Sequence, residues 1–220
     1  NGVASVAALG SDEVFVDGTQ LRAEFGTSVA WLGDLDGDGT SELAVSEPWR
    51  GDFLDPPGDS TVWLLSVDDP RSIVATKRID SEVVGGGPHR RFGTALAAIG
   101  DVDADGVGDL AVSDFWDPDL YPHDGVVWIL FLQSDGGVKD VRRIAVTDAP
   151  IASVIGMPRS DRNFGASLAG PGDLDGDSVP DLAIGVPGYG ASETNAPGAI
   201  VIAYLDAAGG VKHARRITDE

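Results

Sequence analysis

Three acidic loops hold the residues of this sequence best suited to chemistry. Loop 1 (residues 34–42), loop 2 (residues 101–109) and loop 3 (residues 173–181) each carry carboxylates at positions 1, 3, 5 and 9. Alternate positions of a tight turn direct their side chains toward one centre, and position 7 adds a main-chain carbonyl oxygen. Calcium prefers several oxygen ligands at about 2.3–2.6 Å, so the pattern predicts up to three Ca²⁺ ions per chain.

The predicted ligands follow the same order in each loop. They are the side chains of Asp34, Asp36, Asp38 and Glu42, of Asp101, Asp103, Asp105 and Asp109, and of Asp173, Asp175, Asp177 and Asp181, with the carbonyls of Thr40, Val107 and Val179. No Lys or Arg lies within loop 1, so its carboxylates repel one another unless a cation neutralises them. A bound ion would also tie together the two strands that flank each loop.

Acidic loops of this kind have two other interpretations. An EF-hand needs a bidentate Glu at position 12 and flanking helices, whereas position 12 here is Val45, Val112 or Ile184 between strand-like segments. Asp residues between strands also form simple Asx turns, but three loops in register favour a metal site. Loop 3 is the weakest of the three predictions, because Ser178 replaces the glycine of position 6 and Pro180 follows.

Composition limits the class of protein. The chain has 220 residues, 42 % hydrophobic, with a formal net charge of −21 and no cysteine. Such a length supports a buried core, and such a charge argues against partners that are nucleic acids or anionic membranes. No apolar run is long enough to span a membrane, and no disulfide framework exists.

The loops belong to a repeat that begins at Phe25, Phe92 and Phe164. After each Phe-Gly pair comes a short small-residue strand, then the loop, then a four-residue apolar run, a longer Trp- or Val-rich run, and a polar run bearing Lys and Arg. The last two runs start at Ser60 and Ser72 in the first copy. No segment keeps a helical 3.6-residue period over a helix's length. Four strands per repeat, repeated in series, predict an all-β fold of propeller blades made of four-stranded antiparallel sheets.

The predicted division of the chain is one propeller domain, residues 1–220. It consists of a partial repeat over about residues 1–24, from the segment that begins at Ala4, and full repeats over about 25–91, 92–163 and 164–220. Three blades do not close a ring, and closed propellers have about 4–8 blades. Either the chain is a fragment of a longer one, which is the preferred interpretation, or copies of it associate to complete a propeller.

The Phe-Gly pairs and the acidic loops together resemble the FG-GAP repeat of integrin alpha-subunit propellers and their bacterial relatives. The Gly-Ala-Pro-like element is best kept at Gly185-Val186-Pro187 and has drifted to Ser46-Glu47-Pro48 and Ser113-Asp114-Phe115. The resemblance implies a β-propeller with Ca²⁺ on the loop between the first and second strands of each blade. It also implies that ligands bind the opposite face. The lack of cysteine favours a bacterial source.

Candidate ligand residues are aromatic side chains on the loops of that opposite face. They are Trp49, Trp116, Tyr121 and Tyr189, which are able to contact a protein or a sugar ring; covering the seams between blades is the other interpretation. The Arg50-Gly51-Asp52 tripeptide is interpreted as incidental, and the three histidines have no metal-site spacing.

No nucleophile elbow or phosphate loop is present, and Glu47, Asp114 and Glu193 are not paired as catalytic carboxylates are, so no enzyme is predicted. The prediction is a calcium-binding adhesion or protein-interaction scaffold that is extracellular, on the cell surface or periplasmic. Extracellular calcium modules bind at about 10⁻⁴–10⁻³ M, which requires abundant Ca²⁺. The alternatives are a glycan-binding propeller that uses the loop aromatics, and a non-catalytic structural segment of a larger surface protein or enzyme.

Overall fold

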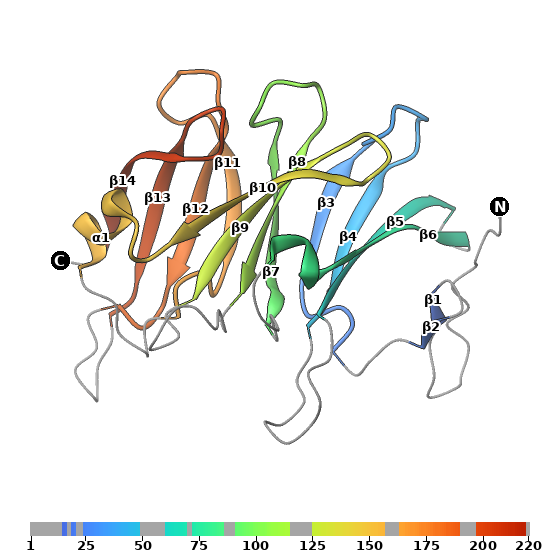
Figure 1. Cartoon of the computed structure of the whole chain (residues 1–220), viewed down its shortest axis with the longest axis horizontal. Helices are drawn as coiled ribbons and strands as arrows, with labels where there is room; N and C mark the ends of the chain where they lie inside the picture. Colours follow the sequence, from blue (N-terminus) through green and yellow to red (C-terminus); the bar gives the residue numbers. More distant parts are fainter. Residues whose placement is uncertain are drawn as a thin grey trace.

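The computed structural model describes residues 15–16, 19–20, 24–48, 60–69, 72–85, 91–114, 125–156, 163–189 and 197–218. Within them lie three sheets of four antiparallel strands each, in which every strand pairs with its neighbours in the sequence (Figure 1). The ring of blades is not closed. The prediction of an all-β fold built from propeller blades is confirmed.

Each blade is an up-and-down meander of four strands. Blade 1 has β3 (Val29–Gly33), β4 (Glu42–Glu47), β5 (Thr61–Asp69) and β6 (Ser72–Asp80). Blade 2 has β7 (Phe92–Gly100), β8 (Asp109–Asp114), β9 (Val126–Leu132) and β10 (Val138–Ala145). Blade 3 has β11 (Leu168–Gly172), β12 (Asp181–Val186), β13 (Ala199–Leu205) and β14 (Val211–Ile217).

Burial explains why the middle strands of blade 2 contain apolar runs, whereas its outer strand carries charged residues. Every residue of β8 and of β9 is buried, because both faces of these strands are covered. The outer strand β10 has exposed residues along its first part and is buried only at its end. A charged outer strand presents an edge that resists pairing with other chains.

Most of the hydrophobic core lies between the blades, and a smaller cluster of Val45, Trp63 and Leu65 lies on blade 1 alone. One cluster joins blades 1 and 2, and another joins blades 2 and 3. The phenylalanines of the second and third Phe-Gly pairs, Phe92 and Phe164, are fully buried there. Gly93, in the left-handed conformation with φ of 91°, packs so tightly on the preceding blade that a Cβ would lie 2.8 Å from Ser46 Cβ. The Phe-Gly pair is therefore a contact between consecutive blades.

Four short elements of the described part of the chain lie outside the blades. The helix α1 (Ala149–Ile155) follows blade 2 and contacts β14, and the 3₁₀ helix η1 (Ser81–Val84) follows blade 1. The sequence pattern did not indicate α1, because its seven residues are too few for a visible period; two of them, Ile151 and Ile155, are buried. The strands β1 (Phe15–Val16) and β2 (Thr19–Gln20) pair with each other, and the predicted strand segment from Ala4 lies outside the described residues.

The two end blades expose apolar side chains. On blade 1, Val29 and Trp31 are 57 % and 58 % exposed. On blade 3, Leu174, Ile200 and Ile217 are 45–51 % exposed. Ile200 aligns with Val127 of blade 2, which the next blade buries completely. In the described part of the chain, no helix is long and apolar enough to cross a membrane.

Candidate metal centres

Loops 1, 2 and 3 join the first and second strands of their blades. They lie at the same edge of the three sheets, the upper edge in Figure 1. This is the connection that the repeat pattern predicts for the metal sites. The flanking strands pair with each other, so the two ends of each loop are held close together.

Position 1 organises the turn in each loop. Its carboxylate accepts the main-chain N–H of position 6 at 3.0 Å in loop 1 (Asp34 and Gly39) and at 2.8 Å in loop 2 (Asp101 and Gly106). Loop 3 makes the same 2.8 Å bond with Ser178, which adopts the left-handed conformation with φ of 74°. The serine at position 6 therefore keeps the backbone turn of the other two loops.

Position 9 anchors each loop to the sheet. Glu42, Asp109 and Asp181 are at most 4 % exposed, and each accepts the N–H of position 2 at 2.8–2.9 Å. In blades 2 and 3 the second carboxylate oxygen also accepts an N–H from the third strand, that of Leu132 or Leu205, at 3.0 Å. This carboxylate links the loop, the second strand and the third strand.

The structure brings positions 1, 3 and 9 together in all three loops. The clusters are Asp34, Asp36 and Glu42; Asp101, Asp103 and Asp109; and Asp173, Asp175 and Asp181, and in each of them one oxygen per residue lies within 4.8 Å of the others. In loop 2, Asp103 Oδ1 is buried and has no hydrogen-bond partner. A buried carboxylate oxygen without a donor is costly unless a cation meets it. The donor set is all oxygen, so these residues fit a hard divalent cation such as Ca²⁺.

Position 5 is held differently from the other three. Its carboxylate accepts the N–H of position 7 at 2.7 Å in loop 1 (Asp38 and Thr40), 2.9 Å in loop 2 (Asp105 and Val107) and 3.0 Å in loop 3. It is outside the clusters of positions 1, 3 and 9. Hydrogen bonds from the Thr40 hydroxyl and N–H lower the pKa of Asp38. Ligation through position 5, which the sequence predicts, would require this side chain to turn inward.

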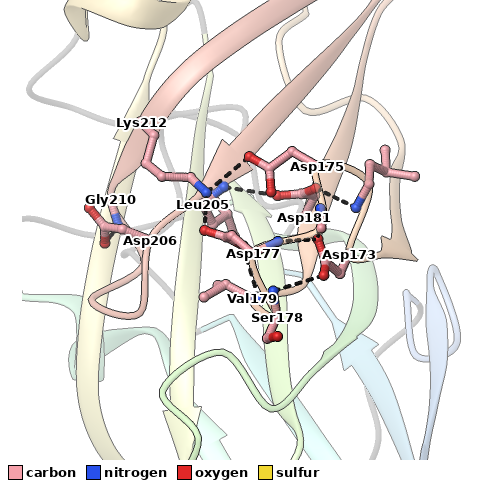
Figure 2. A network of polar contacts seen from close by, with 12 residues as sticks. Asp173, Asp175, Asp177, Ser178, Val179, Asp181, Leu205, Asp206, Gly210 and Lys212 are labelled. Carbon is pink, nitrogen blue, oxygen red and sulfur yellow. Dashed lines mark hydrogen bonds and ion pairs between the residues drawn. The ribbon is translucent and has the colours of Figure 1, made fainter.

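Two lysines from the outer strands reach into loops 2 and 3. Lys139 Nζ lies 2.8 Å from Asp103 and also pairs with Asp105. Lys212 Nζ lies 3.0 Å from Asp175 and pairs with Asp177 (Figure 2). Hydrogen bonds from these ammonium groups lower the pKa of Asp105 and of Asp177.

The sequence pattern did not predict that these two lysines contact the acidic loops. The available signal was the recurrence of Gly-Gly-Val-Lys at residues 136–139 and 209–212. Each lysine lies 34 or more residues after the loop carboxylate that it contacts, so spacing alone does not pair them.

Burial raises the pKa of two position 9 carboxylates, Asp109 and Glu42. Desolvation raises the pKa of Asp109 from 3.8 to about 6, against the lowering effect of its bonds with Val102 and Leu132. Desolvation, with the nearby charges of loop 1, also raises the pKa of Glu42. A divalent ion would oppose this rise because it stabilises the ionised carboxylates.

The predicted ligand residues are only partly covered by the structure. Trp49, Trp116 and Tyr121 lie outside the described residues. Tyr189 is half-buried, accepts a hydrogen bond from Arg216 and lies under the Arg216 guanidinium at 4.7 Å from the ring centroid. Its ring therefore helps to join β14 to the loop after β12.

The carboxylates weighed for catalysis are not arranged as an acid–base pair in the described part of the chain. Glu47 is buried and accepts the indole N–H of Trp63 at 2.8 Å. Asp114 is completely buried at the end of β8. Glu193 lies outside the described residues. His213 stacks on Tyr204 with ring centroids 4.1 Å apart.

Comparison with known proteins agrees with this architecture. The sequence model of the FG-GAP repeat matches residues 25–65 and 164–202. Similar proteins include integrin alpha-PS2 of Drosophila melanogaster, 34 % identical over 77 % of this chain, and integrin alpha-PS5 of the same organism, 36 % identical over 78 %. Human integrin alpha-7 is 31 % identical over 79 % of this chain.

The chain spans only a small part of these relatives: 12 % of integrin alpha-PS2, 16 % of integrin alpha-PS5 and 13 % of integrin alpha-7. Between the two segments that the repeat model matches, blade 2 has the same four-stranded topology and the same loop geometry as its neighbours. The chain is therefore built of FG-GAP repeats and is a member of that propeller family, homologous to integrin alpha subunits over about 77 % of its length.

Proposed function

We propose that this chain is a calcium-stabilised FG-GAP propeller segment that serves as a scaffold for adhesion or protein interaction. Calcium binding is supported most directly by the carboxylate cluster of positions 1, 3 and 9, which recurs in all three loops. In loop 2, the buried Asp103 Oδ1 also has no hydrogen-bond partner. When bound, the ion would supply the positive charge that offsets the crowded carboxylates. The residues that would hold it are the twelve predicted side chains and the carbonyls of Thr40, Val107 and Val179.

In this role, the chain's own residues position the cation sites. The position 1 carboxylate fixes the turn through the N–H of position 6, and the position 9 carboxylate fixes the loop to the adjacent strands. These bonds set the carboxylates of positions 1 and 9 in place before a cation arrives, which lowers the cost of ordering them on binding, whereas the position 5 side chain still has to turn inward. Cation binding would stabilise the join between the first and second strands of a blade rather than create it.

The test is thermal unfolding in 10 mM CaCl₂ and in excess chelator, with MgCl₂ as the matched control cation. For a dissociation constant of about 10⁻⁴–10⁻³ M, each occupied site contributes about 1.4–2.7 kcal/mol at this concentration. A rise in Tm of several degrees in calcium, larger than in magnesium, is expected. Identical curves in calcium and chelator would refute the proposal.

The scaffold role is proposed for a compartment rich in calcium: outside the cell, at its surface or in a periplasm. The support is the similarity to integrin alpha subunits together with the acidic loops. A partner protein is the proposed ligand, and no catalytic activity is proposed. Glycan binding through Trp49, Trp116 and Tyr121 stays a prediction, which a glycan array with Trp→Ala variants would test.

We also propose that further blades cover the exposed flanks of blades 1 and 3. Supporting this are Val29 and Trp31 at one end and Ile200 at the other, where the equivalent side chain of blade 2, Val127, is buried by its neighbour. The covering blades would come from the same polypeptide or from a second copy, and the repeat boundaries at residues 25, 92 and 164 stay predictions. Light scattering in calcium tests the second-copy form, which a strictly monomeric mass would exclude.

A further inference from the structure

Lys139 and Lys212 occupy equivalent places in blades 2 and 3. Each lies at an irregularity of the last strand: Lys139 between the residues paired with Leu132 and Phe131, and Lys212 between those paired with Leu205 and Tyr204. Such a bulge re-aims a side chain that would otherwise follow the strand's alternation. Both lysines contact positions 3 and 5 of the loop in their own blade. Figure 2 shows this arrangement for Lys212 and loop 3.

Blade 1 lacks this arrangement at the corresponding register. Ile73 and Val74 pair directly with Val67 and Ser66, with no intervening residue. Within the described residues, no Lys or Arg pairs with a carboxylate of loop 1. Position 5 there is bonded instead by the Thr40 hydroxyl, which also lies 3.0 Å from the hydroxyl of Ser66.

The lysine contacts are more enclosed than an ordinary surface ion pair. The side chains of Lys139 and Asp103 are 24 % and 26 % exposed, whereas those of the surface pair Lys77 and Asp135 are 36 % and 68 % exposed. Less solvent between two charges means a stronger interaction. The ammonium groups therefore neutralise part of the charge of loops 2 and 3 when no other cation is near.

The two oxygens of Asp103 have different surroundings: one contacts Lys139, and the other is free to meet a cation. Oδ2 holds the Lys139 ammonium at 2.8 Å, while Oδ1 is the buried oxygen without a donor. A dication at the cluster of positions 1, 3 and 9 would share the Asp103 carboxylate with the ammonium. Like charges on one carboxylate repel, so the lysine opposes the incoming ion.

We propose that Lys139 and Lys212 act as internal counter-ions of loops 2 and 3, which weaken calcium binding there and preserve the two blades when calcium is absent. The inference rests on the proposed calcium binding and adds its regulation. Loop 1 has no such lysine among the described residues, so its fold depends more on the metal. The three sites are thereby unequal, although their carboxylates occupy the same positions.

The test compares Lys139→Met, Lys212→Met and the double variant with Lys77→Met, the control lysine of an outer strand whose partner lies outside the loops. Calcium affinity is measured by competition with a chelator, starting from the calcium-loaded protein, so that a variant unstable without metal still gives a value. Each lysine pairs with two carboxylates of its loop, so its removal predicts calcium binding up to about thirtyfold tighter at the altered loop. In chelator, the same variants unfold at lower denaturant concentration than Lys77→Met.

The methionine substitutions are expected to raise calcium affinity but to lower stability in chelator. These opposite effects distinguish a counter-ion from a merely structural lysine. Tighter calcium binding together with lower metal-free stability supports the inference, and Lys139→Arg, which keeps the charge, restores wild-type behaviour. Weaker or unchanged calcium affinity in the methionine variants overturns it while the proposed function stands. No calcium binding by the wild type overturns the proposed function itself.

Discussion

The substitution Asp109→Asn tests two roles of a buried carboxylate at position 9. The carboxylate accepts main-chain N–H groups, and it is proposed to hold a cation. Asp109 is fully buried and accepts the N–H groups of Val102 at 2.9 Å and Leu132 at 3.0 Å. Because its pKa rises from 3.8 to about 6, its ionisation at pH 7 costs the metal-free fold about 3 kcal/mol. Asparagine removes this cost but cannot accept both N–H groups, which costs about 1–3 kcal/mol. In chelator, the variant is therefore expected to lie within about 2 kcal/mol of the wild type.

In 10 mM calcium, a different effect of Asp109→Asn on stability is expected. If Asp109 holds a cation, the variant loses the contribution of loop 2, about 1.4–2.7 kcal/mol at 10 mM calcium. The rise in Tm that calcium produces should therefore be about 3–11 °C smaller in the variant than in the wild type. Thermal and urea unfolding in both solutions, followed by circular dichroism, measure the difference.

The pH dependence in chelator gives an independent check of the same residue. The folded state binds the Asp109 proton more tightly than the unfolded chain, so its cost is absent below a pH of about 3.8 and complete above about 6. The stability of the wild type relative to the variant should therefore fall as the pH rises through this window. Comparing the two proteins cancels the titration of the other carboxylates.

The control is Asp140→Asn, an exposed residue of β10 whose side chain accepts only the adjacent N–H of Val141 at 2.8 Å. It should change stability little and equally in both solutions. Two results would refute the reasoning about Asp109. One is an equal loss of stability in calcium and chelator, and the other is a difference from the wild type that is constant between pH 4 and 6.

Two further predictions concern packing. Gly170→Ala should destabilise the protein by about 1–3 kcal/mol in urea unfolding, because a Cβ would lie 2.3 Å from the Ala98 carbonyl oxygen. The control Gly108→Ala should be close to neutral, because the nearest neighbour of its Cβ would be 3.9 Å away. Equal effects of the two substitutions would contradict the close approach of β7 and β11. Trp63→Phe should cost about 1.5–3 kcal/mol, because it removes the 2.8 Å hydrogen bond to the buried Glu47 carboxylate. Glu47→Gln, which keeps an acceptor, should cost less, and the reverse order in urea unfolding would argue against that bond.

The sequence alone was enough to predict the blades and their acidic loops. Local patterns carry this information: the Phe-Gly pairs, the alternating carboxylates of loops 1, 2 and 3 and the apolar runs that follow them. Each pattern describes a turn or a strand whose residues are neighbours in the chain. Where the pattern was too short, as in the seven residues of α1, the element was missed.

Tertiary structure decided the contacts that join distant segments. The bond from Leu132 to Asp109 and the approach of Lys139 to Asp103 each depend on how the strands of a blade pair. The tight fit of Gly93 against Ser46 depends on how one blade meets the next. The physical reason is that the type and spacing of loop residues set which atoms are able to bind a cation, whereas strand register and blade packing determine which other charges surround them.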